Sequence, residues 1–138
     1  MTLTLEDHQR LLNSLAKAME NQGITITHVD INGTPEYFDE KYRKLPIPKE
    51  RDGYKPDLEG MKGALRHLGE AKITVKDDKN LDSQFKAFTS LEMNGKEIPF
   101  HIAVPKSIKK EVEKKLYKLG LYDKYKKGNI KIWGDDQL

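Results

Sequence analysis

The sequence predicts an α/β domain in which helices flank a mixed β-sheet. Three segments carry apolar residues at helical spacing, and several short segments carry the alternating apolar residues of strands. Near the C-terminus a strand, a helix and a strand follow one another, which favours a right-handed parallel crossover, whereas the middle strands are expected to be antiparallel. The expected order is α-β-β-β-α-β-α-β. A chain of 138 residues suffices for one core and not for two ordinary ones, so residues 1–138 are expected to form a single domain.

The first helix is expected to begin at Thr4. Its hydroxyl can cap the helix, and Glu6 and Asp7 would place negative charge in the first turn. The helix is expected to end at Asn21-Gln22-Gly23. Between these limits, apolar residues recur at helical spacing and give the helix one buried face: Leu11, Leu12, Leu15 and Met19.

The next segments predict three strands and one long connection. Residues 24–31 alternate as a strand that a turn at Asn32-Gly33 closes. Residues 34–53 contain three prolines and many charges, so they are expected to form a long, irregular connection of the kind that often carries function. Residues 54–59 and 68–76 are expected to be two paired strands.

The C-terminal half predicts two helices and two strands. The second helix is expected to end at Asn94-Gly95 and the third to follow a strand at 98–104, with a last strand at 129–133. Both helices are identified by apolar residues at helical spacing: Leu81, Phe85, Phe88 and Leu91 in the second, and Ile108, Val112, Leu116 and Leu119 in the third.

Composition excludes several classes of protein. The chain has no cysteine, so it can form neither disulfides nor a thiolate zinc site. It has no apolar stretch long enough to span a membrane and no signal-peptide pattern, so a cytoplasmic protein without membrane contact is expected. Gly-rich phosphate loops, nucleophile elbows and paired-histidine zinc motifs are absent from the sequence. The net charge of +3 is too small to indicate nucleic-acid binding by itself.

Positive charge is concentrated near the C-terminus. Residues 106–127 contain nine lysines and three acidic residues. One interpretation is a solvated helix face, which is what charge runs usually are. The other is a surface that attracts phosphates, which would matter beside a site that handles nucleic acid.

The stretch "YKPDLEGMKGALRHLGEAKI", residues 54–73, carries the candidate chemistry. Glu70 and Lys72 lie two apart in a predicted strand, so both side chains leave the same face. Asp57 is expected near the end of the preceding strand, and pairing of the two strands would let Asp57 and Glu70 converge. Asp/Glu-x-Lys triplets also occur in the predicted connection, in a turn and on a helix, but there the geometry does not suit a shared site.

Two convergent carboxylates and a backbone carbonyl form the oxygen-rich kind of site that Mg²⁺ or Mn²⁺ prefers. A lysine beside them can hold the attacking water and offset charge on a phosphate. The alternative is structural, because Glu70 and Lys72 could be an ion pair on a solvated face and Asp57 an ordinary residue at a strand end.

The chain resembles the PD-(D/E)XK superfamily of metal-dependent nucleases, which includes restriction endonuclease-like and Holliday-junction resolvase-like enzymes. The resemblance covers nearly the whole domain and consists of a leading helix followed by a characteristic succession of segments: "KPDLEG", "GEAKI", "LDSQFKAF", "FHIAVPKS" and "IKIW". A restriction endonuclease-like fold is therefore expected.

The resemblance implies roles for individual residues. Asp57 and Glu70 would be metal ligands, with the carbonyl of Ala71 as the third. Lys72 would be the catalytic lysine, and Gln84, on the helix that follows, would orient water or phosphate.

Many relatives also place an acid on the first helix. Glu6 has the required chemistry but points away from the apolar face of that helix, whereas His8 lies on it. Either residue is a candidate to complete the site. His8 could instead be an ordinary hydrogen-bonded core histidine, and Glu6 could simply favour the helix dipole. The other histidines, His28, His67 and His101, are interpreted as structural or surface residues.

The resemblance implies an endonuclease that hydrolyses phosphodiester bonds with Mg²⁺ or Mn²⁺. Double-stranded or branched DNA is the expected substrate, with RNA as the open alternative, and a homodimer is the expected assembly. Lysines of the third helix would supply nonspecific phosphate affinity. Lysines of the connection and its end would add to it: Lys44, Lys49 and Lys55. Two alternatives remain open. One is a noncatalytic nucleic-acid-binding or assembly module that retains the fold; the other is a structural protein in which the motif is accidental.

Overall fold

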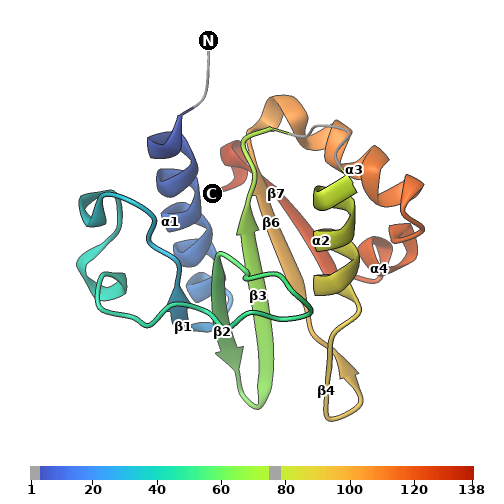
Figure 1. The fold of residues 1–138 in the computed structure, drawn as a ribbon, viewed down its shortest axis with the longest axis horizontal. Coiled ribbons are helices and arrows are strands. Elements are labelled where there is room, and N and C mark those ends of the chain that lie inside the picture. The colour runs from blue at the N-terminus through green and yellow to red at the C-terminus, as the bar shows by residue number, and fades with distance from the viewer. Residues whose placement is uncertain (1–3, 75–78) are drawn as a thin grey trace.

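A mixed sheet lies between two helical layers in the computed structural model, which describes residues 4–74 and 79–138 (Figure 1). The sheet has five strands in the order β1-β2-β3-β6-β7. Their bounds are Thr25–Val29 for β1, Leu58–Lys62 for β2, Leu65–Ala71 for β3, Phe100–Val104 for β6 and Ile130–Gly134 for β7. Strands β1, β2 and β3 are antiparallel neighbours, whereas β3, β6 and β7 are parallel. The predicted mixed sheet and its main element order are therefore confirmed.

The helices divide between the two faces of the sheet. Helix α1 (Leu5–Asn21) packs on one face, with the side chains of Leu58, Ala71 and Ala103. Helices α2 (Lys79–Thr89), α3 (Lys109–Lys118) and α4 (Tyr122–Lys126) lie on the other side, where α2 and α3 share a core with alternate residues of β3, β6 and β7 (Figure 1). Because successive strand residues face opposite layers, one short strand serves two cores.

Helix α1 begins as the sequence predicts. The amide of Asp7 donates to the Thr4 hydroxyl at 3.3 Å, and the amide of Thr4 donates to the Asp7 carboxylate at 2.7 Å. This reciprocal cap satisfies amides that the first helical turn leaves without partners. Among the described residues, no helix is both long enough and apolar enough to cross a membrane.

The predicted bounds of the two middle strands, 54–59 and 68–76, are wrong. The strands form a hairpin closed at Gly63-Ala64, and the part of the second prediction beyond residue 74 lies outside the described residues. Glycine weakens a strand by propensity, which is why residues 60–67 gave no strand signal. Tertiary packing nevertheless requires a glycine at position 60, because a Cβ added to Gly60 would lie 2.6 Å from a methyl carbon of Ile24.

The connection at 34–53 is less irregular than predicted. It contains two short 3₁₀ turns, η1 (Pro35–Tyr37) and η2 (Glu40–Tyr42). Phe38 and Tyr42 are fully buried in the core beneath α1. The connection is thus anchored to the domain by two aromatic side chains.

Several short elements have no counterpart in the prediction. A two-stranded hairpin, β4 (Glu92–Met93) and β5 (Lys96–Glu97), surrounds Asn94-Gly95, which was expected only to end a helix. Both turn residues have positive φ, +53° and +78°, as a tight hairpin turn requires. Helix α4 and the 3₁₀ turns η3 (Lys106–Ile108) and η4 (Asp135–Gln137) were also missed, because elements this short carry little periodic signal.

Two buried histidines form a directed hydrogen-bond chain within the sheet. The indole of Trp133 can only donate, so its Nε1–H donates to Nδ1 of His101 at 3.3 Å. The opposite nitrogen of His101 must then donate to Nδ1 of His67 at 3.0 Å. His67 and His101 are therefore structural residues, as predicted. Burial lowers the pKa of His67, and burial with the neighbouring His67 and Lys131 lowers the pKa of His101 to about 3.

Stability is therefore expected to fall on mild acidification. A histidine whose pKa drops from 6.5 in the unfolded chain to about 3 in the fold contributes stability above pH 6.5 and loses it as the pH falls toward 3. At pH 5 the expected loss is ~2 kcal/mol. Urea unfolding at pH 7 and pH 5 measures it, and His101→Leu should flatten the difference even if it lowers stability at both pH values. An equal pH dependence in the variant would contradict the assignment.

Candidate active site

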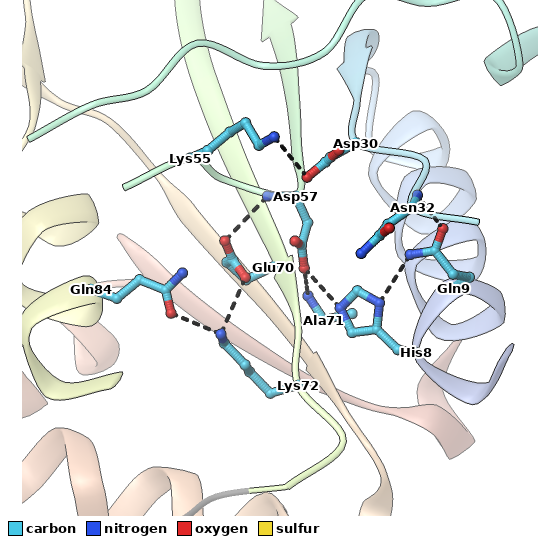
Figure 2. Close-up of polar contacts among 10 residues, drawn as sticks. All are labelled: His8, Gln9, Asp30, Asn32, Lys55, Asp57, Glu70, Ala71, Lys72 and Gln84. Carbon is cyan, nitrogen blue, oxygen red and sulfur yellow. Dashed lines mark hydrogen bonds and ion pairs between the residues drawn. The ribbon is translucent and has the colours of Figure 1, made fainter. Parts of the chain in front are cut away.

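The register of the β2–β3 hairpin brings Asp57 and Glu70 together. Leu58 pairs with Gly69 in the antiparallel ladder. Asp57, which precedes Leu58, therefore lies beside Glu70, which follows Gly69. The backbone N–H of Asp57 donates to Oε1 of Glu70 at 3.2 Å (Figure 2). Asp57 was predicted near the end of a strand, but it directly precedes β2. Convergence nevertheless follows, because the start of β2 adjoins the end of β3.

The carboxylate of Asp57 is fixed by two contacts at one oxygen. Its Oδ2 accepts the backbone N–H of Ala71 at 2.9 Å and lies 3.2 Å from Nε2 of His8 (Figure 2). Burial alone would raise the pKa of Asp57, but the hydrogen bonds from His8 and from the Ala71 amide outweigh it and hold the pKa below its usual value. Neither contact occupies Oδ1.

Glu70 is the more deeply buried carboxylate, with 2% of its side chain exposed. Burial, together with the negative charge of Asp57, raises its pKa well above the usual range, and the ammonium of Lys72 opposes this only in part. Lys72 Nζ lies 3.5 Å from Oε2 of Glu70. A buried carboxylate thus lies beside a part-buried one, and the ammonium of Lys72 only partly offsets the charge of Glu70, which is the electrostatic setting of a cation site.

Lys72 is positioned by the neighbouring helix. Its Nζ donates to Oε1 of Gln84, on α2, at 2.8 Å. Its backbone N–H donates to the carbonyl of Ala103 at 2.9 Å, which anchors the residue to β6 just beyond the end of β3. The structure therefore brings together Asp57, Glu70, Lys72 and Gln84 from three elements, as the sequence predicts.

His8 is the residue of α1 that reaches this cluster, and buried Gln9 orients it. The backbone N–H of Asn32 donates to Oε1 of Gln9 at 2.9 Å, so the Gln9 amide nitrogen faces His8 and donates to Nδ1 at 3.1 Å. Nε2 of His8 then carries the proton that is donated to Asp57. Gln9 was not predicted. The available signal was a glutamine on the apolar stripe of α1, one turn before Leu12.

Glu6 lies outside the cluster. Its carboxylate accepts a hydrogen bond from Nε of Arg10 at 2.7 Å, and about half of its side chain is exposed. The helical wheel accounts for this position, because Glu6 projects from the solvent side of α1. Of the two candidates on the first helix, the structure brings only His8 to Asp57.

A third carboxylate, that of Asp30, lies close by without joining the pair. The N–H of Asp30 donates to the backbone carbonyl of Asp57 at 2.8 Å, while its side chain lies 3.4 Å from Nζ of Lys55 (Figure 2). Part of the charge of Lys55 is therefore neutralised within the protein. This reduces what Lys55 can offer to a phosphate.

The donor set suits a hydrated divalent cation better than an ion held by protein alone. Asp57 and Glu70 supply two carboxylates and Ala71 a carbonyl, whereas residues 4–74 and 79–138 contain no group of three or more His, Asp or Glu side chains arranged to hold a metal. Mg²⁺ dehydrates reluctantly and usually binds through one or two carboxylates with several waters. The residues present fit that mode of binding.

Comparisons with protein-family models, with curated proteins and with solved structures give no match for this chain. The resemblance to PD-(D/E)XK nucleases therefore rests on its own motif and element order. The structure adds to these the convergence of two carboxylates, a lysine and a glutamine at one end of β3.

Proposed function

We propose that the protein is a Mg²⁺- or Mn²⁺-dependent nuclease of the PD-(D/E)XK type, with a restriction endonuclease-like fold and DNA as its substrate. One observation carries the proposal. The buried carboxylate of Glu70 and the part-buried carboxylate of Asp57 meet at the end of β3 beside a lysine that a glutamine holds in place. The same order of elements and the same residue types characterise that superfamily.

A purely structural ion pair accounts poorly for this arrangement. Burying the charge of Glu70 beside the carboxylate of Asp57 costs free energy, and Lys72 offsets only part of that cost. Apolar side chains in the same space would stabilise the domain more. Stored repulsion of this kind is typical of sites that bind a cation or carry out catalysis.

The residues would divide the work of phosphodiester hydrolysis. Asp57, Glu70 and the carbonyl of Ala71 would hold a divalent cation, which supplies charge neutralisation at the phosphate and a more acidic water. Lys72 can donate three N–H bonds. One goes to Gln84 and one faces Glu70, so one remains for the attacking water or a phosphate oxygen. Gln84 fixes the direction of that remaining donor, and His8 holds the carboxylate plane of Asp57.

The test is cleavage of a panel of labelled substrates: linear, flapped, four-way and single-stranded DNA, and RNA. Each is incubated with Mg²⁺, Mn²⁺ or EDTA. Cleavage is expected with metal and not with EDTA, and Asp57→Ala should lack it. Melting temperature measured with and without metal gives a second readout, because a ligand that binds only the folded state raises it.

The two readouts separate the alternatives. A metal-dependent rise in melting temperature without cleavage of any substrate would favour a noncatalytic module that retains the fold. If neither cleavage nor a metal-dependent rise in melting temperature is observed, the motif is accidental. Cleavage that persists in Asp57→Ala would place the active site elsewhere. Sedimentation of the same preparation tests the proposed homodimer.

A further inference from the structure

A pair of tyrosines is exposed where α3 meets α4. The side chain of Tyr117 is 71% exposed and that of Tyr122 is 37% exposed. Their rings contact edge to face with centroids 5.7 Å apart, and the ring centroid of Tyr125 lies 5.9 Å from that of Tyr122. Large aromatic rings clustered on a surface mark an interaction site more often than single exposed apolar residues do.

The same surface carries lysines that form no ion pair among the described residues. Lys110, Lys114 and Lys118 follow one another at intervals of four residues, so they lie along one side of α3. Nζ of Lys126 lies 6.0 Å from the ring centroid of Tyr122. No ion pair involves any of these four lysines within the part of the chain that the structure describes.

Two nearby lysines show the contrast, because they are engaged within the protein. Lys115 donates to Asp82 of α2 at 2.6 Å, and Lys124 lies 3.4 Å from Glu97 of β5. The lysine row on α3 therefore presents charge outward, although Glu111 lies beside Lys114 and Lys118 and Glu113 lies near Tyr125.

The row starts at the end of the sheet that carries the candidate active site. Strands β3 and β6 are parallel, so Val104 ends at the same edge of the sheet as Ala71. Helix α3 follows β6 from that edge and runs back along the domain toward Tyr117 (Figure 1). Over the eight residue steps from Lys110 to Lys118 the helix rises ~12 Å. Positive charge thus extends from the edge that holds Asp57 and Glu70 toward the tyrosines.

We propose that the tyrosine pair Tyr117–Tyr122 and the lysine row of α3 bind single-stranded nucleic acid. Bases have flat faces that stack on exposed aromatic rings without regard to sequence, and the lysines attract the phosphates that connect them. Bases in a duplex are already stacked and offer such rings no free face. The surface therefore selects unpaired strands.

This inference deepens the proposed function, on which its second part rests. A nuclease with this surface acts on DNA that has a single-stranded extension beside the position of cleavage, such as a flap or an overhang. The first part, binding of an unpaired strand, stands without any catalytic activity.

The test is anisotropy of a short labelled oligo-dT, an oligo-rU of equal length and a blunt duplex, all with Lys72→Ala protein in EDTA, so that nothing is cleaved. Tyr117→Ser is expected to weaken binding of the single strands about tenfold, and Tyr117→Phe, which keeps the ring, should bind as the parent does. Lys114→Ala and Lys118→Ala should each reduce the slope of log affinity against log salt concentration by about one, because each variant releases about one counterion fewer. Lys17→Ala, on the opposite helical layer, is the control and should change nothing.

Equal binding by Tyr117→Ser and Tyr117→Phe would overturn the proposal, as would equal affinity for the duplex. A surface that captures an acidic peptide but no single strand would overturn it too and indicate a protein partner. Failure of the catalytic proposal can be told apart from failure of this one. Tyrosine-dependent binding without any cleavage by wild type would refute catalysis and support single-strand binding. If wild type cleaves, a flap preference that Tyr117→Ser loses would support the second part, and an unchanged preference would refute it.

Discussion

Replacing Lys72 with methionine is expected to reduce metal-dependent cleavage by ~10²–10³-fold, the usual cost of removing one preorganised donor from a site where charge develops. Nζ of Lys72 lies between Glu70 Oε2 and Gln84 Oε1, so it is held at the site before any substrate arrives. Methionine keeps much of the side-chain length and packing while removing the charge and all three N–H donors. The initial rate of cleavage at saturating metal measures the effect.

Lys55→Met is the matched control. Lys55 also lies 3.4 Å from a carboxylate close to the site, that of Asp30, but it contacts neither Glu70 nor Gln84. It should keep cleavage within a few-fold of wild type and weaken only nonspecific phosphate contact. Equal losses in the two variants would show that general positive charge matters and that Lys72 has no special role.

Replacing Glu70 with glutamine is expected to abolish cleavage and yet stabilise the metal-free protein by ~1–3 kcal/mol. Glutamine has nearly the same shape and can still accept the N–H of Asp57 at its Oε1. It also removes an ionisable carboxyl. Burial and the negative charge of Asp57 raise the pKa of that carboxyl well above its ordinary value. The rise in melting temperature on adding metal should shrink, because one ligand has lost its charge. Urea unfolding in EDTA and thermal unfolding with metal give both readouts.

The pH dependence of this gain follows from the direction of the shift. A carboxyl with a raised pKa in the fold binds its proton more tightly there than in the unfolded chain. Its ionisation therefore costs stability as the pH rises above the ordinary value of 4.5. The advantage of Glu70→Gln should be largest at neutral pH and should disappear below that value.

Glu59 provides a buried glutamate of the opposite kind. Only 2% of its side chain is exposed, and Nε of Arg51 donates to it at 3.0 Å, with Arg66 and His28 nearby. Its charge is compensated, so Glu59→Gln should lower stability by ~3 kcal/mol, since it leaves the part-buried arginines without their anion. If Glu70→Gln destabilises as much as Glu59→Gln, Glu70 is an ordinary structural charge and the cation site is wrong.

Much of the candidate site could be predicted from local sequence. The two-residue spacing of Glu70 and Lys72 in a strand determines that both leave one face, whatever surrounds them. Gln84 could be predicted only through the family resemblance, because nothing in the local pattern distinguishes it from a surface glutamine. The choice between Glu6 and His8 depended on the helical wheel, which favoured His8 for the apolar face and left its role open.

The sequence alone determined the α/β class, the succession of the main helices and strands, and the residue types that could handle a divalent cation. These follow from periodicities of the backbone that need no distant contact. Tertiary structure decided the hairpin register that places Asp57 against Glu70, the hydrogen bonds that run from Asn32 to Gln9 and from Gln9 to His8, and the place of Tyr117 at the end of a lysine row. The physical reason is that register, burial and hydrogen-bond partners are set by segments far apart in the chain. At Gly60, for example, the space left by Ile24, and not local propensity, determines where the strand runs.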